Sequence, residues 1–183
     1  MDDLQAIRRL KGGDISGLES LVLRYQPKAV HVAFLITHDE GLAQDIVQDT
    51  FVRLYQRIRQ FDEGRPFEPY LMRSVVNAAL NAMRGHARFT SLDDDASEVE
   101  NLLDRAASIE SQVEVTQLQQ EILNALSRLP PRQRAAIVQR YYLEMSEQEM
   151  AQALDIAPGT IKWLLNAARA RLRRLLGAER SAE

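Results

Sequence analysis

The segment "APGTIKWLLNAARARLRRLL" (157–176) carries one lysine, four arginines and no acid, in a chain whose net charge is −3. At about 100° per residue, an apolar face lies opposite a polar and basic one. Cations bind phosphates, and polar or apolar groups between them contact base edges in the major groove. The segment therefore predicts a helix that binds duplex DNA. Its predicted contact residues are Gly159, Thr160, Lys162, Trp163, Asn166, Arg169 and Arg173. Two alternatives stay open, a solvated basic face on which Trp163 binds protein and a helix on a membrane surface.

A second segment, "FEPYLMRSVVNAALNAMRGHAR" (67–88), places an aromatic ring, amides and arginines on one helical face that has neither Glu nor Lys. Rings stack on unpaired bases, arginines hold phosphates, and amides contact base edges. The loop "FDEGRPF" just before it contributes further rings. We predict a site for single-stranded DNA formed by Phe61, Phe67, Tyr70, Arg73, Asn77, Asn81 and Arg84. The alternative is that the rings are core residues that close the loop and the amides are neutral surface.

A third segment, "DEGLAQDIVQDTFVRLYQRI" (39–58), combines two stripes at helical spacing. We expect the apolar stripe to be buried, with Tyr55 among its members. The other stripe holds Asp45, Gln48, Asp49, Val52 and Gln56. An exposed valine among acids and amides favours docking against a basic partner helix. A charged stripe that is merely solvated is the alternative.

The sequence contains few residue patterns that are typical of a catalytic site. There is no cysteine, which excludes disulfides, thiolate nucleophiles and cysteine-ligated metals. His31, His38 and His86 are scattered, without metal-ligand spacing such as H-E-x-x-H. A glycine-rich phosphate loop and a nucleophile elbow are both missing. We therefore predict no catalytic residue, no metal and no cofactor.

The elements that position these residues are helical, because strand patterns are nearly absent. Helices are predicted at 3–11, 14–26, from 28 to 36 after a break or kink at Pro27, 39–59, 69–85, 116–127, 131–143, 146–154 and 158–176. Ser146 and Glu149 form the S-x-x-E pattern of a capping box. The short turn "DIAP" then leads into the long basic helix, an arrangement typical of a helix-turn-helix.

The composition changes between the two groups of helices. Residues 90–115 contain eight acids and one arginine, which predicts a mobile acidic linker; a capped surface helix at "SEVENLLDR" is the alternative for part of it. The fold class is therefore predicted as all-α, with two small helical domains, 1–89 and 116–178, joined by the linker 90–115 and followed by a tail, 179–183. The acidic amphipathic N-terminus and the lack of a long apolar run predict a cytoplasmic protein.

The three segments, in this order, resemble the bacterial sigma factors of the extracytoplasmic-function (ECF) group. The helix 39–55 resembles the pattern D-x-x-D-x-x-Q-[ED]-[TV]-F-x-x-[LV]-[WY] of the core-polymerase-binding helix, at Asp45, Gln48, Asp49, Phe51 and Tyr55. The segment from Phe67 is similar to the promoter-melting segment, with its aromatic-Leu-x-x-[IV]-x-x-N pattern. The C-terminal part is similar to the family's helix-turn-helix domain at Leu129, Pro130, Arg134, Glu149, Ala151, Gly159, Thr160 and Lys162.

This resemblance implies a function and partners for each segment. The third segment would bind the clamp helices of the largest subunit of core RNA polymerase through Asp45, Gln48, Asp49, Val52 and Arg53. The Tyr70 helix and the 61–67 loop would capture the opened strand of the −10 promoter element. The last helix would read the −35 element as duplex. Such factors are often held by an anti-sigma protein, which nothing in this sequence identifies, and they do not insert into membranes.

The sequence also departs from the family. In the last helix, Trp163 stands in place of a usual serine, and Leu164 and Ala167 stand in place of arginines. Each lost phosphate contact is expected to flatten the salt dependence of binding by about one unit of slope. Asp155 occupies the place of a frequent turn glycine, and aspartate tolerates left-handed backbone better than most residues. Tyr70 replaces the usual tryptophan, a change that preserves stacking.

Two other classes of protein fit parts of the pattern. A stand-alone helix-turn-helix regulator with an N-terminal sensing domain predicts a ligand pocket and specific duplex binding without polymerase. An adaptor protein would use the acidic stripe without DNA, but the basic last helix argues against it.

Overall fold

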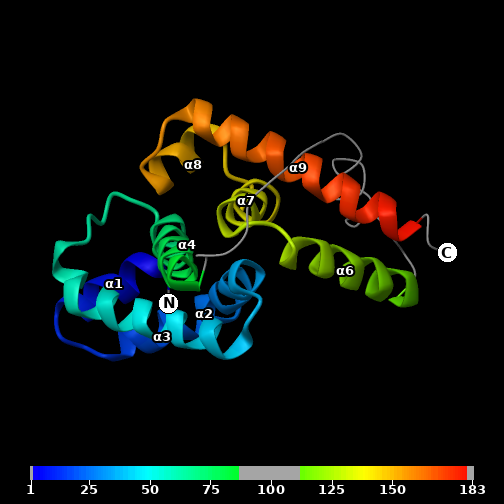
Figure 1. Cartoon of the computed structure of the whole chain (residues 1–183). Coiled ribbons are helices and arrows are strands. Elements are labelled where there is room, and N and C mark those ends of the chain that lie inside the picture. Colours follow the sequence, from blue (N-terminus) through cyan, green and yellow to red (C-terminus); the bar gives the residue numbers. More distant parts are fainter. Residues whose placement is uncertain (1, 87–111, 181–183) are drawn as a thin grey trace. The chain divides into compact units, whose positions relative to one another are not determined.

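The computed structural model describes residues 2–86 and 112–180, and every regular element in these ranges is helical, which confirms the all-α prediction (Figure 1). The chain divides into two compact units, Met1–Ala82 and Met83–Glu183. The predicted acidic linker lies outside the described residues, except for 112–115, which belong to a helix. Its character and the domain boundaries remain predictions.

The first unit contains α1 (Asp3–Lys11), α2 (Ser16–Thr37), α3 (Glu40–Arg57), a short 3₁₀ turn η1 (Ile58–Gln60) and α4 (Phe67–His86) as far as Ala82. α2 packs against both α1 and α3. α1 and α3 begin at polar caps: the Asp2 carboxylate accepts the Gln5 N–H at 2.8 Å, and the Asp39 carboxylate accepts the Leu42 N–H at 2.9 Å. The largest fully buried side chains are Leu21, Val32, Ile36, Val47, Leu71, Val75 and Val76.

The sequence predicts a break or kink at Pro27; α2 is one continuous helix, so the break is wrong. A proline in a helix lacks the N–H that would bond to the carbonyl four residues earlier, here that of Leu23. Both residues lie on the exposed side of α2, where Leu23 is 73% exposed. Water can reach the freed carbonyl there, so the helix tolerates the proline.

Tyr55 is 46% exposed and does not belong to the buried stripe of α3. The neighbouring apolar residues Phe51, Leu54 and Ile58 are buried as predicted. Tyr55 lies about 40° beyond Phe51, on the side away from Leu54, at 100° per residue. This position is the edge of the stripe, where a tyrosine can keep its hydroxyl in water.

The second unit contains α6 (Gln112–Ser127), α7 (Pro131–Ile137), a π-helical turn η2 (Val138–Tyr142), α8 (Glu147–Leu154) and α9 (Pro158–Arg180). The helix predicted at 131–143 is therefore an α-helix only as far as Ile137. α9 packs against α6, α7 and α8, and its buried face includes Ile161, Leu165 and Leu172.

A buried arginine joins α6 to α7. Arg134 is 5% exposed, and its Nη2 donates to the carbonyl oxygens of Ser127 at 2.7 Å and Leu129 at 3.0 Å. These carbonyls, at and just beyond the end of α6, would otherwise lack a helical partner. Burial lowers the pKa of Arg134 to about 10, so the guanidinium stays charged at neutral pH.

α8 has a defined cap at each end. The Ser146 hydroxyl accepts the Glu149 N–H at 3.2 Å, and the Glu149 carboxylate accepts the Ser146 N–H at 2.7 Å, which confirms the capping box. Hydrogen bonds to the Glu149 carboxylate from the Ser146 hydroxyl, at 2.7 Å, and from the Ser146 N–H lower the pKa of Glu149. α8 ends at Asp155 in left-handed backbone, with φ 53° and ψ 49°. The turn thus adopts the conformation that a glycine would take most easily.

Gln139 lies fully buried in η2, at 0% exposure. Neither its amide oxygen nor its amide nitrogen has a hydrogen-bond partner. A buried amide without partners costs about 1–3 kcal/mol. Gln139 therefore weakens the second unit.

Gln139→Leu should raise the free energy of unfolding by about 1–3 kcal/mol, because an apolar side chain of similar size removes the unpaired amide. The measurement is urea unfolding of the full chain, followed by circular dichroism. Gln148→Leu, at an exposed position of α8, is the matched control and should change the midpoint little. A midpoint for Gln139→Leu at or below that of the unmodified chain would contradict the assignment.

Candidate interfaces for nucleic acid and protein

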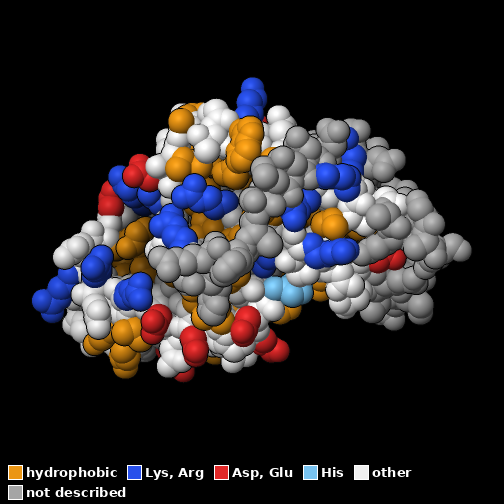
Figure 2. Space-filling view, viewed as in Figure 1, with side chains coloured by type: hydrophobic (Ala, Val, Ile, Leu, Met, Phe, Trp, Pro, Cys, Tyr) orange, Lys and Arg blue, Asp and Glu red, His pale blue; other side chains and the backbone are white. Residues whose placement is uncertain are grey.

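The acid and amide stripe of α3 faces solvent. Asp45, Gln48, Asp49 and Arg53 are exposed, and Val52 is 48% exposed. Figure 2 shows Asp and Glu side chains gathered over α3, in the lower part of the view. Arg53 and Asp49 approach to 3.6 Å, with 69% and 72% of their side chains exposed. An ion pair so exposed adds little stability, so these charges are available for another protein.

A groove between α2 and α3 borders this stripe. Its apolar walls include Leu18, Val22 and Val30 from α2 and Val47, Phe51 and Val52 from α3. Sequence reasoning missed the groove, although the four-residue spacing of the α2 residues was a signal. A spacing shows which residues share a helix face, but it does not show which face of another helix lies beside it.

The predicted single-strand residues separate into an exposed and a buried group. Arg73, Asn81 and Arg84 are exposed on α4, Tyr70 is 37% exposed, and Asn77 is half-buried. Their spacing places them along one side of the helix. The Ser74 hydroxyl, which lies beside them, donates to the Tyr70 carbonyl at 2.9 Å.

Phe61 and Phe67 are core residues, not exposed rings. They are 7% and 3% exposed, and their ring centres lie 5.8 Å apart. Phe67 also packs against Tyr25 at 5.6 Å, and Phe61 packs against Tyr70 at 5.0 Å. The alternative of rings that close the loop is therefore the one that the structure supports. Tyr70 is the ring of this cluster that remains exposed.

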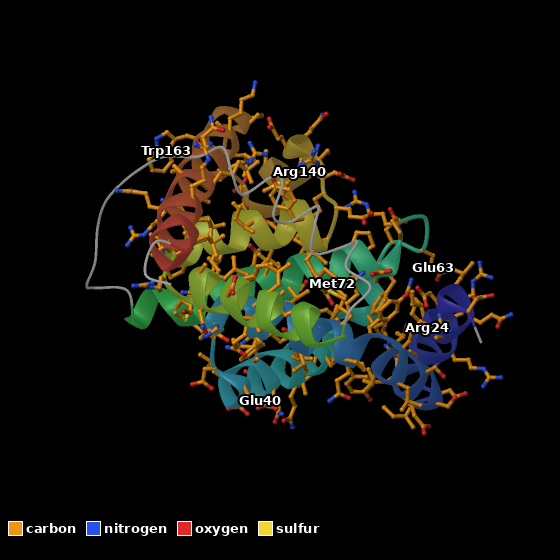
Figure 3. All side chains as sticks on the ribbon, turned by 90° about the vertical axis from the view of Figure 1, so that its right-hand side faces the viewer. Arg24, Glu40, Glu63, Met72, Arg140 and Trp163 are labelled. Carbon is orange, nitrogen blue, oxygen red and sulfur yellow. The ribbon has the colours of Figure 1, made fainter. Side chains whose placement is uncertain are left out.

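The residues predicted to contact duplex DNA occupy the outer face of α9, with different degrees of exposure. Trp163 projects from the helix with 63% exposure (Figure 3). Gly159, Thr160, Lys162 and Asn166 are exposed, whereas Arg169 and Arg173 are half-buried. Leu164, which stands in place of a family arginine, is 4% exposed and belongs to the core.

Arg169 is held by a ring from η2. Its Nε donates to the Tyr141 hydroxyl at 2.9 Å, and its guanidinium carbon lies 5.9 Å from the centre of the Tyr141 ring. The hydrogen bond fixes the direction of the guanidinium. Sequence reasoning missed this contact, because Tyr141 and Arg169 are far apart along the chain.

Neither a metal site nor a membrane span is present in the part of the chain that the structure describes. No group of three or more His, Asp or Glu side chains is arranged there to hold a metal ion. His38 instead stacks on Phe34, with ring centres 5.4 Å apart. None of the helices within the described ranges has the length and apolar character that crossing a membrane requires.

Comparison with known proteins assigns both units. The family model for sigma-70 region 2 matches residues 21–89, and that for sigma-70 region 4 matches residues 119–172. The chain is 30% identical over 170 residues to the ECF RNA polymerase sigma-E factor of Escherichia coli K12, covering 88% of this chain and 87% of that protein. It is 28% identical over 176 residues to the ECF RNA polymerase sigma factor SigW of Bacillus subtilis, covering 93% and 94%.

A solved structure shares the fold. CnrH, determined in complex with the cytosolic domain of CnrY, matches with a TM-score of 0.61 at 23% identity, over 99% of this chain and 98% of that one. The two sigma-70 regions and a relative of 30% identity over most of both chains lead to one conclusion: this chain belongs to the ECF RNA polymerase sigma factors, which direct RNA polymerase to promoters through regions 2 and 4.

Proposed function

We propose that this sigma factor reads its promoter at two places while it is docked on core RNA polymerase. α9 reads the −35 element as duplex, the Tyr70 face of α4 captures the opened −10 strand, and the α3 stripe binds the clamp helices. The observation that carries the proposal is that Trp163 and Tyr70, the aromatic residues of the two predicted DNA faces, are 63% and 37% exposed. Buried rings could not reach bases.

The duplex role rests on the charge and shape of α9. Lys162 is exposed on the same helix as Trp163, and Arg169 is held in one direction by Tyr141. A cation that is already oriented loses less entropy when it binds a phosphate. Leu164 lies in the core, so the phosphate or base contact of the family's arginine is absent here; we assign a part in recognition to the neighbouring, exposed Trp163.

The single-strand role rests on α4. Tyr70 offers a ring for stacking, and exposed Arg73 and Arg84 offer charges for the backbone. The buried Phe61 supports the Tyr70 ring from below at 5.0 Å. Phe61 and Phe67 therefore act as support in this proposal, and Tyr70 is the stacking residue.

The docking role rests on the α3 stripe, where acids, an amide and an exposed valine fit a basic amphipathic helix. An anti-sigma protein is a further partner that we propose, since the sigma factor RpoE of Bartonella quintana, which matches with a TM-score of 0.62 at 23% identity, was solved with the anti-sigma factor NepR. We propose that the two regions form domains 1–89 and 116–178, joined by the acidic linker 90–115 and followed by the tail 179–183. The factor would work in the cytoplasm, as an initiation factor and not as an enzyme.

Run-off transcription tests the whole proposal. Core polymerase is mixed with a genomic promoter library, with and without this protein. Transcripts from defined start sites should appear only when the protein is present. Specific duplex binding by the protein alone, without any gain from polymerase, would instead favour a stand-alone regulator.

Asp45→Arg combined with Asp49→Arg should abolish binding to core polymerase, because two exposed acids become cations that repel a basic partner. The measurement is co-purification with core enzyme in the absence of DNA. Glu19→Arg combined with Glu40→Arg changes the net charge equally at exposed sites outside the stripe and should bind normally. Co-purification of the Asp45/Asp49 variant would show that docking lies elsewhere.

Tyr70→Ala should slow strand opening more than initial complex formation, by about 5-fold to 150-fold, since one stacked base contributes about 1–3 kcal/mol. The measurement compares opening on duplex and on premelted promoters, and premelting should rescue the variant. Tyr70→Trp keeps a stacking surface and serves as the control. A Tyr70→Ala defect of equal size on both templates would argue against a single-strand role.

Trp163→Ala should change the preferred −35 sequence and leave the thermal midpoint unchanged, because the ring is mostly exposed. The measurement is selection of a randomised −35 element with the reconstituted holoenzyme. Arg174→Ala, an exposed change farther along α9, serves as the control. An unaltered preference would assign Trp163 to contact with protein.

A further inference from the structure

α1 is joined to the loop 61–66, which precedes α4, by three polar contacts. Arg8 Nε lies 2.8 Å from one carboxylate oxygen of Glu63, and Lys11 Nζ lies 3.0 Å from the other. Lys11 Nζ also donates to the carbonyl oxygen of Phe61 at 2.7 Å. Glu63 lies beside α1 in Figure 3. One carboxylate thus bridges two cations of α1, and one of these cations also holds the backbone of the loop.

The contact between Lys11 and Glu63 is more sheltered than an ordinary surface ion pair, whereas the Arg8 side chain is 63% exposed. The side chains of Lys11 and Glu63 are 23% and 32% exposed, whereas those of Arg9 and Asp14, the next pair along, are 57% and 51% exposed at 4.0 Å. Sheltered charges are screened less by salt. Hydrogen bonds from Arg8 and then Lys11 lower the pKa of Glu63, so the carboxylate is charged at neutral pH.

The other hydrogen bonds of the loop do not attach it to α1. The Asp62 carboxylate accepts the Gly64 N–H at 3.0 Å, and the Asp62 carbonyl accepts the Arg65 N–H at 3.1 Å. Both bonds lie within the loop, so they shape its turn. They do not determine where the loop lies relative to α1. Besides the buried rings of Phe61 and Phe67, the polar contacts to α1 determine that position.

The link continues to the exposed face of α4 through one ring. Lys11 holds the carbonyl of Phe61, and the ring of Phe61 packs against Tyr70 at 5.0 Å. A loose loop would let Phe61 shift and would leave Tyr70 with a less defined support. Holding a binding residue in place before its ligand arrives lowers the ordering cost of binding.

We propose that Lys11 and Arg8 are positioning residues for strand capture: through Glu63 and Phe61 they hold the loop 61–66, and with it Tyr70, in the arrangement that receives the opened strand. Neither cation needs to touch DNA. α1 precedes residue 21, where the region 2 match begins, so this role lies outside the matched segment. The proposal rests on the strand-capture function of Tyr70.

The test uses Lys11→Met in the full-length chain, with two readouts. Amide hydrogen exchange of the 61–66 segment, measured without DNA or polymerase, should become faster. With core polymerase, on a promoter recovered by run-off selection, strand opening should slow about threefold to tenfold, as expected for one lost hydrogen bond. A premelted promoter should rescue this defect, and binding to core enzyme should not change.

Two further variants of α1 serve as controls. Arg9→Met removes the same charge from α1 at an exposed residue whose ion pair is with Asp14, outside the loop, and it should behave as the unmodified protein. Lys11→Arg keeps a donor at this position and should retain most of the function.

A double-mutant cycle tests whether Lys11 acts through Glu63. Glu63→Gln alone should also slow opening. The loss in Lys11→Met combined with Glu63→Gln should be smaller than the sum of the two single losses, because both variants remove the same contact between Lys11 and Glu63. Residues that act through one contact give such non-additive losses. Fully additive losses would overturn the link.

The remaining outcomes separate the failure of this proposal from that of the strand site. Unchanged exchange in Lys11→Met overturns the link to the loop. The positioning role is overturned if Lys11→Met speeds hydrogen exchange of the 61–66 segment but opens promoters at the normal rate, while Tyr70→Ala opens them slowly. If Lys11→Met weakens core binding and lowers the thermal midpoint as well as slowing opening, its effect is purely structural, and the positioning role is again overturned. If Tyr70→Ala itself opens promoters normally, the strand-capture function fails, and this proposal fails with it.

Discussion

Each unit of this sigma factor is too small to surround a helix, so its helices bury one side and leave the other in water. Small domains bury a smaller fraction of their surface than large ones, and a bundle gains its stability from the inward faces. On α3, buried Val47 and Phe51 alternate with exposed Gln48 and Val52. The outward faces contribute little to packing, and their residues can therefore serve contacts with polymerase and DNA.

Positive and negative charges lie on different exposed surfaces of the chain. The chain has a net charge of −3, yet α9 presents lysine and arginine together with an exposed tryptophan. We infer that the acidic remainder suits a basic polymerase surface and limits indiscriminate DNA binding by the free factor. The cations of α1 have another use, since Arg8 and Lys11 bind Glu63 within the protein.

Polar groups inside the second unit have opposite effects on its stability. Arg134 is buried, but it donates to two carbonyl oxygens around the end of α6 and so joins two helices. Gln139 is buried, and neither its amide oxygen nor its amide nitrogen has a partner. No hydrogen bond compensates for the free energy that removing the amide from water costs. The difference lies in the partners and not in the burial, because a buried polar group stabilises a fold only when its hydrogen bonds are made.

Local pattern is sufficient to predict most of the helices, the capping box at Ser146 and the outward position of Trp163, because capping and helical periodicity involve residues a few positions apart. The left-handed backbone at Asp155 follows instead from the resemblance, since Asp155 stands in the place of a frequent turn glycine. Local pattern is not sufficient for Phe61 and Phe67, whose burial depends on rings of other helices, or for Tyr55 at the edge of its stripe. Nor does it reveal the contact of Lys11 with Glu63, which joins residues 52 positions apart. Such contacts exist only after the helices have packed, since packing determines which faces meet and which carbonyls remain open to water.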